Sequence, residues 1–382
     1  MKLKDRVFNK DLIIILFPLM ILIGKIIRWT ILKSVLVDMS IGNGMIVKVV
    51  NGTGWFTSLS ETGLADAAGN AAVFFRIINF FKLTTRDSFE VYITSIWNII
   101  LALLIFKCKK RLSLVQILFL TASIAVLNIW DFCLAKEPVQ LLFFLAIYYI
   151  LMAKKLNNKV KYIGTFFVLI LSVLYYRVYY ILIIGFIVIV AVILKKWLLK
   201  IKKINKKDII ILLILLSFVY FIMLNVIKAV DGASYNELIR VRTRGGAAAT
   251  QMLNIFKSTN LVLFTLDYLI MIVRMLIPIE LVPMGIKYWP YVFYQIIITY
   301  FLIKNILNIK KNNNIQNFAL YIYIAFLLGS ATFEPDFGSW VRHEAAIFPI
   351  LMILSNVVEC KEEVKNEEKN NKDAEEFDIS NS

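Results

Sequence analysis

Long apolar runs separated by short polar links dominate the hydrophobic pattern of the chain between residues 12 and 358. A helix needs about 20 mostly apolar residues to cross the hydrocarbon core of a bilayer. We therefore predict an all-α fold, a polytopic transmembrane helix bundle of about 10–12 spans. The apolar runs that predict these spans are 12–32, 92–106, 112–130, 139–152, 162–194, 208–227, 261–282, 291–303, 318–332 and 345–358.

The polar stretches divide the chain into a transmembrane domain, residues 1–358, and a short tail. Stretches 38–91 and 228–260 are predicted to be outer loops, the first carrying an apolar helix that lies in the membrane interface at 71–83. The run 162–194 is long enough for two short helices, so a tight hairpin is expected with Arg177 at its turn. The tail, 359–382, is rich in Glu, Lys and Asn and is predicted to be disordered and cytoplasmic.

Composition narrows the class of protein further. Of the 382 residues, 60% are hydrophobic, which excludes a soluble globule. The net charge of +17 indicates cytoplasmic loops of a membrane protein before it indicates a nucleic-acid partner, and no nucleic acid is expected. Three isolated cysteines and one histidine provide neither a disulfide framework nor a metal-ligand spacing, so no metal and no cofactor are predicted.

Lysine-rich links set the predicted orientation in the cell membrane. They occur at the N-terminus, at 107–111, 154–161, 195–207 and 304–311, and in the tail. The positive-inside rule places all of them, and both termini, in the cytoplasm. This assignment conflicts with a single crossing by 261–282, which would put 304–311 outside. We therefore expect 261–282 to re-enter.

The charges within 261–282 fit such a re-entrant segment. Asp267 and Arg274 lie seven residues apart and so share one helix face. A wet lining suits a charged face better than hydrocarbon does. A structural ion pair between these two side chains is an equal alternative.

Arginines are distributed differently from lysines. On this topology, eight of the eleven arginines lie outside or on the re-entrant piece: Arg76, Arg86, Arg177, Arg240, Arg242, Arg244, Arg274 and Arg342. Arginine grips phosphate through two parallel hydrogen bonds and stays charged, so an anion held at the outer membrane level is expected there. Several of these arginines have acidic neighbours in the outer loops that they can pair with instead. Arg177 has no acid nearby in the sequence and stands among tyrosines at the hairpin turn.

Charge is concentrated between the last two apolar runs, in residues 333–344. This stretch holds Glu334, Asp336, Arg342 and His343, the only histidine of the chain. Gly338-Ser339 suggests a helix start with Ser339 as N-cap, which would put Arg342 and His343 in the first turn beside free N–H groups, an anion site. The alternative is a plain polar loop followed by a capped helix.

Taken together, these features resemble the bacterial Wzy-like polysaccharide polymerases, which are membrane glycosyltransferases with lipid-linked donors. The resemblance rests on the number of spans, the two outer loops, the outer arginines Arg177, Arg240–Arg244 and Arg342, Lys136-Glu137-Pro138 at an outer helix start, and Phe89-Glu90. It implies polymerisation, at the outer leaflet, of oligosaccharide units carried on undecaprenyl pyrophosphate, into a capsule, an exopolysaccharide or an O-antigen. It also implies the lipid bilayer, a flippase and a chain-length regulator as partners. The second outer loop is shorter than in many members.

Such a reaction defines the expected site residues. Arg177 and Arg342, with Arg240, Arg244 and Arg274, are expected to carry the charge of the pyrophosphate. A general base for the acceptor hydroxyl is expected among Glu137, Glu334, Asp336 and His343. The helix start at Pro138 favours ionised Glu137, whereas Arg342 disfavours protonation of His343. A histidine that only forms hydrogen bonds is the alternative for His343.

Two other functions remain open on the sequence. A glycosyltransferase that uses a polyprenyl-phosphate sugar would place a catalytic aspartate in the first outer loop, where Asp38 and Asp66 stand. A flippase or other transporter of lipid-linked oligosaccharides would show inverted repeats and charges near mid-membrane. No repeat is evident in the sequence, and the charges gather on one side.

Overall fold

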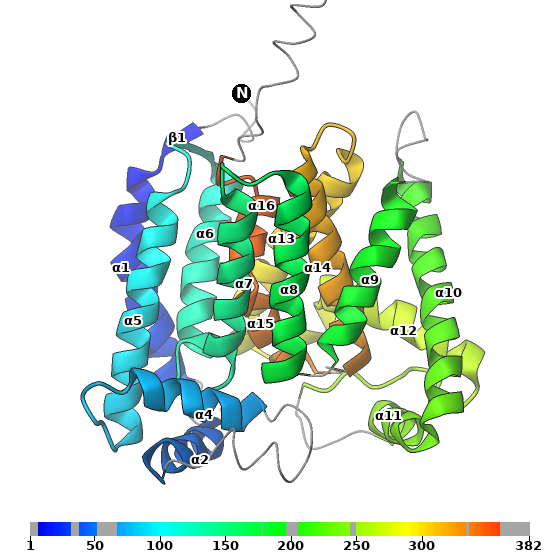
Figure 1. The fold of residues 1–382 in the computed structure, drawn as a ribbon, viewed down its shortest axis with the longest axis horizontal. Coiled ribbons are helices and arrows are strands. Elements are labelled where there is room, and N and C mark those ends of the chain that lie inside the picture. Colours follow the sequence, from blue (N-terminus) through cyan, green and yellow to red (C-terminus); the bar gives the residue numbers. More distant parts are fainter. Residues whose placement is uncertain are drawn as a thin grey trace, which may run out of the picture.

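The computed structural model describes residues 7–31, 38–51, 67–177, 179–195, 205–244, 250–333 and 336–359 (Figure 1). The helices are α1 (Asp11–Ile26), α2 (Asp38–Asn51), α4 (Ala67–Ile78), α5 (Arg86–Phe106), α6 (Leu114–Val126), α7 (Glu137–Met152), α8 (Asn158–Tyr175), α9 (Tyr180–Ile193), α10 (Lys206–Val230), α11 (Gly232–Arg244), α12 (Leu261–Leu276), α13 (Trp289–Leu307), α14 (Asn314–Phe333), α15 (Phe337–Ala346) and α16 (Phe348–Leu354). Two π-helical turns, η2 (Ile27–Ile31) and η3 (Leu127–Asp131), extend α1 and α6, and 3-10 turns η5 (Ile279–Leu281) and η6 (Ile286–Tyr288) precede α13. Strands β1 (Val7–Asn9) and β2 (Arg111–Ser113) pair antiparallel, with Phe8 opposite Leu112.

The predicted class of fold is confirmed: the chain is an all-α, multi-pass bundle. Among the described residues, seven helices are long and apolar enough to cross a membrane, and α7 and α9 are shorter apolar helices. The hairpin predicted at 162–194 is present as α8 and α9.

Three sequence expectations differ from the structure. The two predicted outer loops contain more helix than expected: α2 and the start of α5 lie within 38–91 beside α4, which overlaps the helix predicted at 71–83, and α11 lies within 228–260. The run 345–358 is not one span. It is covered by the end of α15 and by α16. The helix is interrupted at Ile347, because Pro349, in the first turn of α16, cannot continue the preceding helix.

Helix α14 is the core of the bundle, since most of its side chains are buried. A Cβ atom at Gly329 would lie 2.8 Å from the Ile183 side chain, so α14 and α9 approach each other there more closely than an alanine permits. Gly24 serves the same purpose between α1 and α6, where a Cβ would lie 2.9 Å from the carbonyl oxygen of Ala125. Small residues at helix crossings are the usual means of close packing in membranes.

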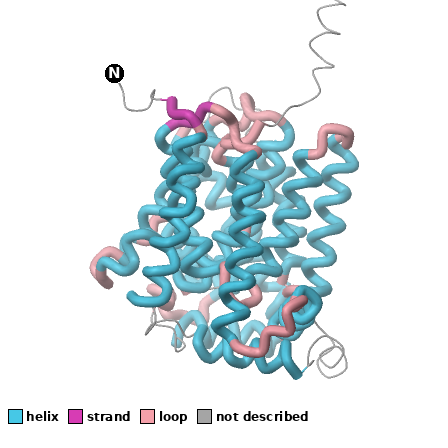
Figure 2. The backbone as a smooth tube through the Cα atoms, turned by 90° about the vertical axis from the view of Figure 1, so that its left-hand side faces the viewer, coloured by secondary structure: helices cyan, strands magenta, loops and turns pink. Residues whose placement is uncertain are grey.

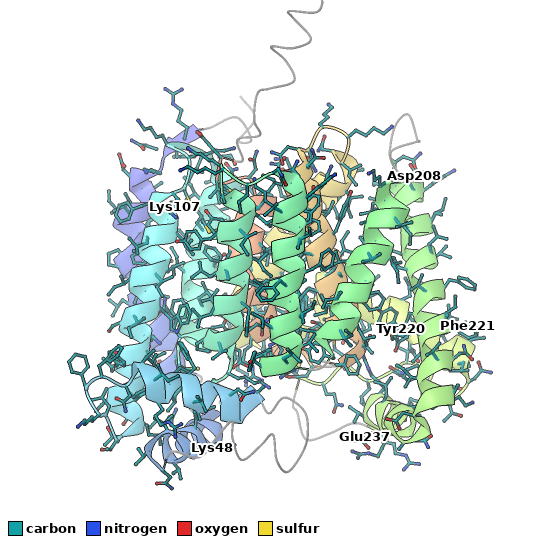
Figure 3. The ribbon with its side chains drawn as sticks, in the orientation of Figure 1. Lys48, Lys107, Asp208, Tyr220, Phe221 and Glu237 are labelled. Carbon is teal, nitrogen blue, oxygen red and sulfur yellow. The ribbon has the colours of Figure 1, made fainter. Side chains whose placement is uncertain are left out.

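The polar links gather at two ends of the bundle. We call one end the lysine end: it carries β1, β2 and the links 107–111, 154–157 and 308–313 (Figure 1), and Lys107 and Asp208 mark it in Figure 3. Figure 2 shows both strands at this end. The opposite end carries α2, α4 and α11, with Lys48 and Glu237 labelled in Figure 3. These three lysine-rich links thus share one end, as the predicted topology requires, while the cytoplasmic side of that end stays a prediction.

Helix α12 does not run the length of the bundle. It crosses the lower half of the view in Figure 1, and its last carbonyl, that of Leu276, accepts a hydrogen bond of 2.6 Å from Thr299 in the middle of α13. Thr299 lies about 15 Å along α13 from Trp289, at 1.5 Å per residue. The chain therefore travels back between Leu276 and Trp289, where Trp289 Nε1 donates to Val282 O at 3.2 Å. This path has the shape expected of a re-entrant segment.

The charges of α12 support this path. Asp267 accepts the backbone N–H of Ile255 at 2.9 Å, and Arg274 donates to Leu253 O at 2.7 Å, so both side chains hold the 253–256 segment against one face of the helix. Arg274 forms its ion pair with Glu280 and not with Asp267. The alternative of an Asp267–Arg274 pair is therefore wrong.

We expect reporter fusions truncated after Lys257 and after Lys287 to report the same side of the membrane. The reason is that a re-entrant α12 leaves and returns to one surface. Alkaline phosphatase and green fluorescent protein fusions at each position, with a fusion after Lys107 as the reference for the lysine end, make the measurement. Opposite sides for the two fusions would contradict re-entry.

A buried ion pair fixes the segment that leads into α7. Arg28 bonds Glu90 at 2.7 Å and the carbonyl of Ile129 at 2.8 Å, and Lys25 bonds the carbonyl of Phe132 at 2.8 Å. These carbonyls belong to η3 and the residue after it, where the helix ends and its acceptors need donors. The contacts position residues 132–136 and hence the start of α7 at Glu137.

Candidate functional site

Glu137 lies at the first residue of α7, at the end of the bundle opposite the lysine end. Pro138 behind it is suited to a helix start, because its missing N–H costs nothing there. Glu137 is 1% exposed. Among the described residues, no group donates a hydrogen bond to either carboxylate oxygen. Arg342 is a counter-charge for it, with Nη1 4.0 Å from Oε1. Burying a carboxyl group without hydrogen bonds costs free energy, so Glu137 is a candidate to bind a ligand.

Arg342 approaches Glu137 from α15. Its side chain is 20% exposed and forms long bonds with the carbonyl of Gly338, at 3.3 Å, and with Ser339 Oγ, at 3.4 Å. Both distances exceed the usual 2.7–3.2 Å of a good N–H···O bond. The guanidinium is thus near the carboxylate and in partial contact with solvent, where an anion can reach it.

The next polar position of α7, Gln140, is three residues on and binds the next residue of α15. Gln140 Nε2 donates to the backbone carbonyl of His343 at 3.0 Å, and Gln140 Oε1 lies 2.7 Å from His343 Nδ1. The hydroxyl of Tyr176 donates to the same Oε1 at 3.0 Å. Gln140, Tyr176 and His343 are all buried. Two consecutive polar contacts therefore join α7 to α15.

Arg177 adjoins this cluster through Tyr176. Its guanidinium lies over the rings of Tyr176 and Tyr179, at 5.8 and 5.3 Å from their centroids, and donates to Tyr179 Oη at 3.2 Å. The positive charges that act on the His343 ring are those of Arg177, Lys136 and Arg342. Glu137 and Arg342 thus approach each other, whereas a single outer cavity that both share with Arg177 stays a prediction.

The remaining predicted residues lie elsewhere or serve the fold. Asp336, not Ser339, is the N-cap of α15: it accepts the N–H of Ser339 at 2.8 Å and also binds the Thr250 hydroxyl. The expected anion site is therefore wrong in detail, because a carboxylate already occupies that helix start and Arg342 lies in the second turn. Glu334 and Asp66 lie outside the described residues.

The α11 and α12 arginines are placed away from Glu137. Arg240 forms an exposed pair with Glu237, and this bond lowers the pKa of the Glu237 carboxyl. Arg244 is exposed at the end of α11, and Arg274 pairs with Glu280. Asp38 is the first residue of α2.

Sequence reasoning missed Gln140 and a buried carboxyl beside the site. Glu344 is fully buried, accepts from Tyr323 at 2.6 Å and from Gln295 at 3.1 Å, and so ties α15 to α14 and α13. Trp340 Nε1 donates to Gln295 at 3.2 Å and extends this network. The available signal was spacing: Gln140 follows Glu137 by three residues, which places both on one face of a helix.

Comparison with protein families, with curated proteins and with solved structures found no match. Within the part of the chain that the structure describes, no group of three or more His, Cys, Asp or Glu side chains has the arrangement of a metal site. The site is therefore defined by its own residues: a buried carboxylate, a nearby arginine, a second arginine stacked on tyrosines, and one histidine. Ionisable groups inside a membrane bundle usually mark a substrate path or a catalytic centre.

The end of the bundle that carries the site is expected to face outward. In a variant without native cysteines, Asn236→Cys on exposed α11 should react with a membrane-impermeant maleimide in intact cells. Lys155→Cys, in the exposed link at the lysine end, is the matched control and should react only after permeabilisation. The reverse pattern would invert the topology.

Proposed function

We propose that this protein is a membrane glycosyltransferase that polymerises oligosaccharide repeat units carried on undecaprenyl pyrophosphate, at the outer leaflet of the bacterial plasma membrane. The observation that carries the proposal is the Glu137–Arg342 pair. It combines an anion-binding group with a buried carboxylate that has no hydrogen bond among the described residues.

The two arginines suit a pyrophosphate. Arg342 is partly exposed and lies 4.0 Å from Glu137, so its guanidinium is placed where an incoming phosphate can accept hydrogen bonds from it. Arg177 is held over the rings of Tyr176 and Tyr179, which orient its guanidinium. Two such donors stabilise the charge that develops on a pyrophosphate leaving group.

Glu137 suits the acceptor. In the transfer, a hydroxyl oxygen of the acceptor sugar bonds to the anomeric carbon of the donor, and the bond from that carbon to the pyrophosphate oxygen breaks. The hydroxyl proton passes to the Glu137 carboxylate, and undecaprenyl pyrophosphate leaves with the bonding electron pair. Arg342, 4.0 Å from Glu137, would hold the leaving group close to the base.

The experiment is the lipid-linked glycan profile of a deletion strain, measured by mass spectrometry of extracted lipids. Accumulation of single complete repeat units, with loss of polymer, is the result expected of a polymerase. Units that lack one sugar would instead indicate transfer of a monosaccharide from a polyprenyl phosphate. Complete units confined to the inner leaflet would indicate a flippase. Either of the last two results would overturn the proposal.

A further inference from the structure

The hydrogen bonds of Gln140 determine which nitrogen of His343 carries the proton. A side-chain amide has one end that only donates and one that only accepts. The end of Gln140 that lies 3.0 Å from the backbone carbonyl of His343 must be the NH2 group, because a carbonyl oxygen cannot donate. The other end is therefore the oxygen Oε1. The hydrogen bonds around Gln140 thus determine the orientation of its amide.

The position of Oε1 then determines which ring nitrogen of His343 carries a hydrogen. Oε1 lies 2.7 Å from His343 Nδ1, and the Tyr176 hydroxyl already donates to it at 3.0 Å. A carbonyl oxygen has two lone pairs, so it accepts both hydrogens. At 2.7 Å, an Nδ1 atom with a lone pair would be repelled, so Nδ1 must carry a hydrogen.

The remaining question is whether the ring is neutral. His343 is 1% exposed, and the positive charges of Arg177, Lys136 and Arg342 act on it. A second ring proton would place a fourth positive charge in a buried setting, which is unfavourable. The neutral ring with hydrogen on Nδ1 has its lone pair on Nε2.

We propose that Gln140 is a positioning residue that holds His343 as the neutral Nδ1–H tautomer and so makes Nε2 a hydrogen-bond acceptor in the site. The ligand of Nε2 would be a sugar hydroxyl, and this identity rests on the proposed function. The tautomer itself does not rest on it. The opposite tautomer would instead present a donor at Nε2.

The chain offers an unusually direct test, because His343 is its only histidine. Full-length protein labelled with ¹⁵N-histidine, purified on a tag without histidine and placed in lipid nanodiscs, has one pair of ring nitrogen resonances. We expect the wild type to show a protonated Nδ1 and an unprotonated Nε2. An Nε2–H tautomer, or a ring protonated at both nitrogens, would overturn the inference.

Variants separate positioning from folding. Gln140→Leu removes the acceptor and should reverse the tautomer ratio towards Nε2–H, whereas Gln140→Glu keeps an acceptor and should retain Nδ1–H. Gln116→Leu is the matched control: it removes a glutamine that bonds Ser355 at the lysine end and should leave the spectrum unchanged. A Gln140→Leu protein that folds with the wild-type tautomer would refute the role of Gln140. If Gln140→Leu fails to fold, the wild-type and Gln140→Glu spectra still test the Nδ1–H tautomer. None of these spectra depends on glycan synthesis, so failure of the tautomer and failure of the proposed function are distinguishable.

Discussion

Arg342→Lys is expected to reduce polymer formation about a hundredfold while leaving the amount of inserted protein nearly unchanged. Lysine keeps the charge beside Glu137 and can still extend to solvent, so the fold survives. It loses the planar fork that holds two phosphate oxygens at once. Loss of one oriented donor to a developing charge costs on the order of 3 kcal/mol, which is the expected hundredfold.

The measurement is glycan chain length in the deletion strain complemented with each variant, normalised to membrane-inserted protein. Arg240→Lys is the control, since Arg240 is an exposed arginine at the same end of the bundle whose partner is Glu237. Arg240→Lys should leave the glycan chain length unchanged, whereas Arg342→Lys should shorten it. Wild-type chains from Arg342→Lys would mean that this guanidinium contributes only charge, and Arg342 would no longer be a binding residue.

Much of the fold followed from hydropathy because burial in hydrocarbon needs long apolar helices. The hairpin around Arg177 was predictable for a related reason, because the length of an apolar run limits how often a chain can cross. The break at Ile347 was missed because Pro349 lies inside a run that is apolar throughout, where hydropathy gives no boundary. Helix α2 was missed because its many small and polar residues resemble a loop.

The site was predicted less completely, for a physical reason. Glu137, Arg342 and His343 were found because a charge in an apolar sequence is conspicuous and costly. Gln140 has no charge, and its importance depends on α15 lying beside α7, a contact between residues 203 positions apart. Asp336 and Glu137 look alike in sequence, yet one caps a helix and the other has no hydrogen bond from a described residue. That difference exists only in the folded chain.

Glu137→Gln is expected to abolish polymer while leaving stability unchanged or raised. The substitution keeps the shape of the side chain and removes the charge, so the acceptor hydroxyl loses its base. General bases contribute about 10²–10⁴-fold to rate, which is the expected loss. Glu137 has no hydrogen bond from the described residues, and Arg342, at 4.0 Å, reaches solvent. Removing the charge therefore relieves a desolvation cost and leaves no buried cation behind.

Glu90→Gln provides the contrast, because Glu90 is a buried acid with a partner. Arg28, 3% exposed, bonds it at 2.7 Å, and Arg86 lies 3.6 Å away. Loss of this charge breaks the buried Arg28–Glu90 ion pair, at a cost of about 3 kcal/mol. Thermal unfolding of the two variants in detergent, measured beside chain length in the complemented strain, should separate them: Glu90→Gln lowers the melting temperature, and Glu137→Gln does not. If Glu137→Gln instead melts early and its chain length falls only in proportion to the protein that remains, Glu137 is a structural partner of Arg342, and the base in the site must be sought elsewhere.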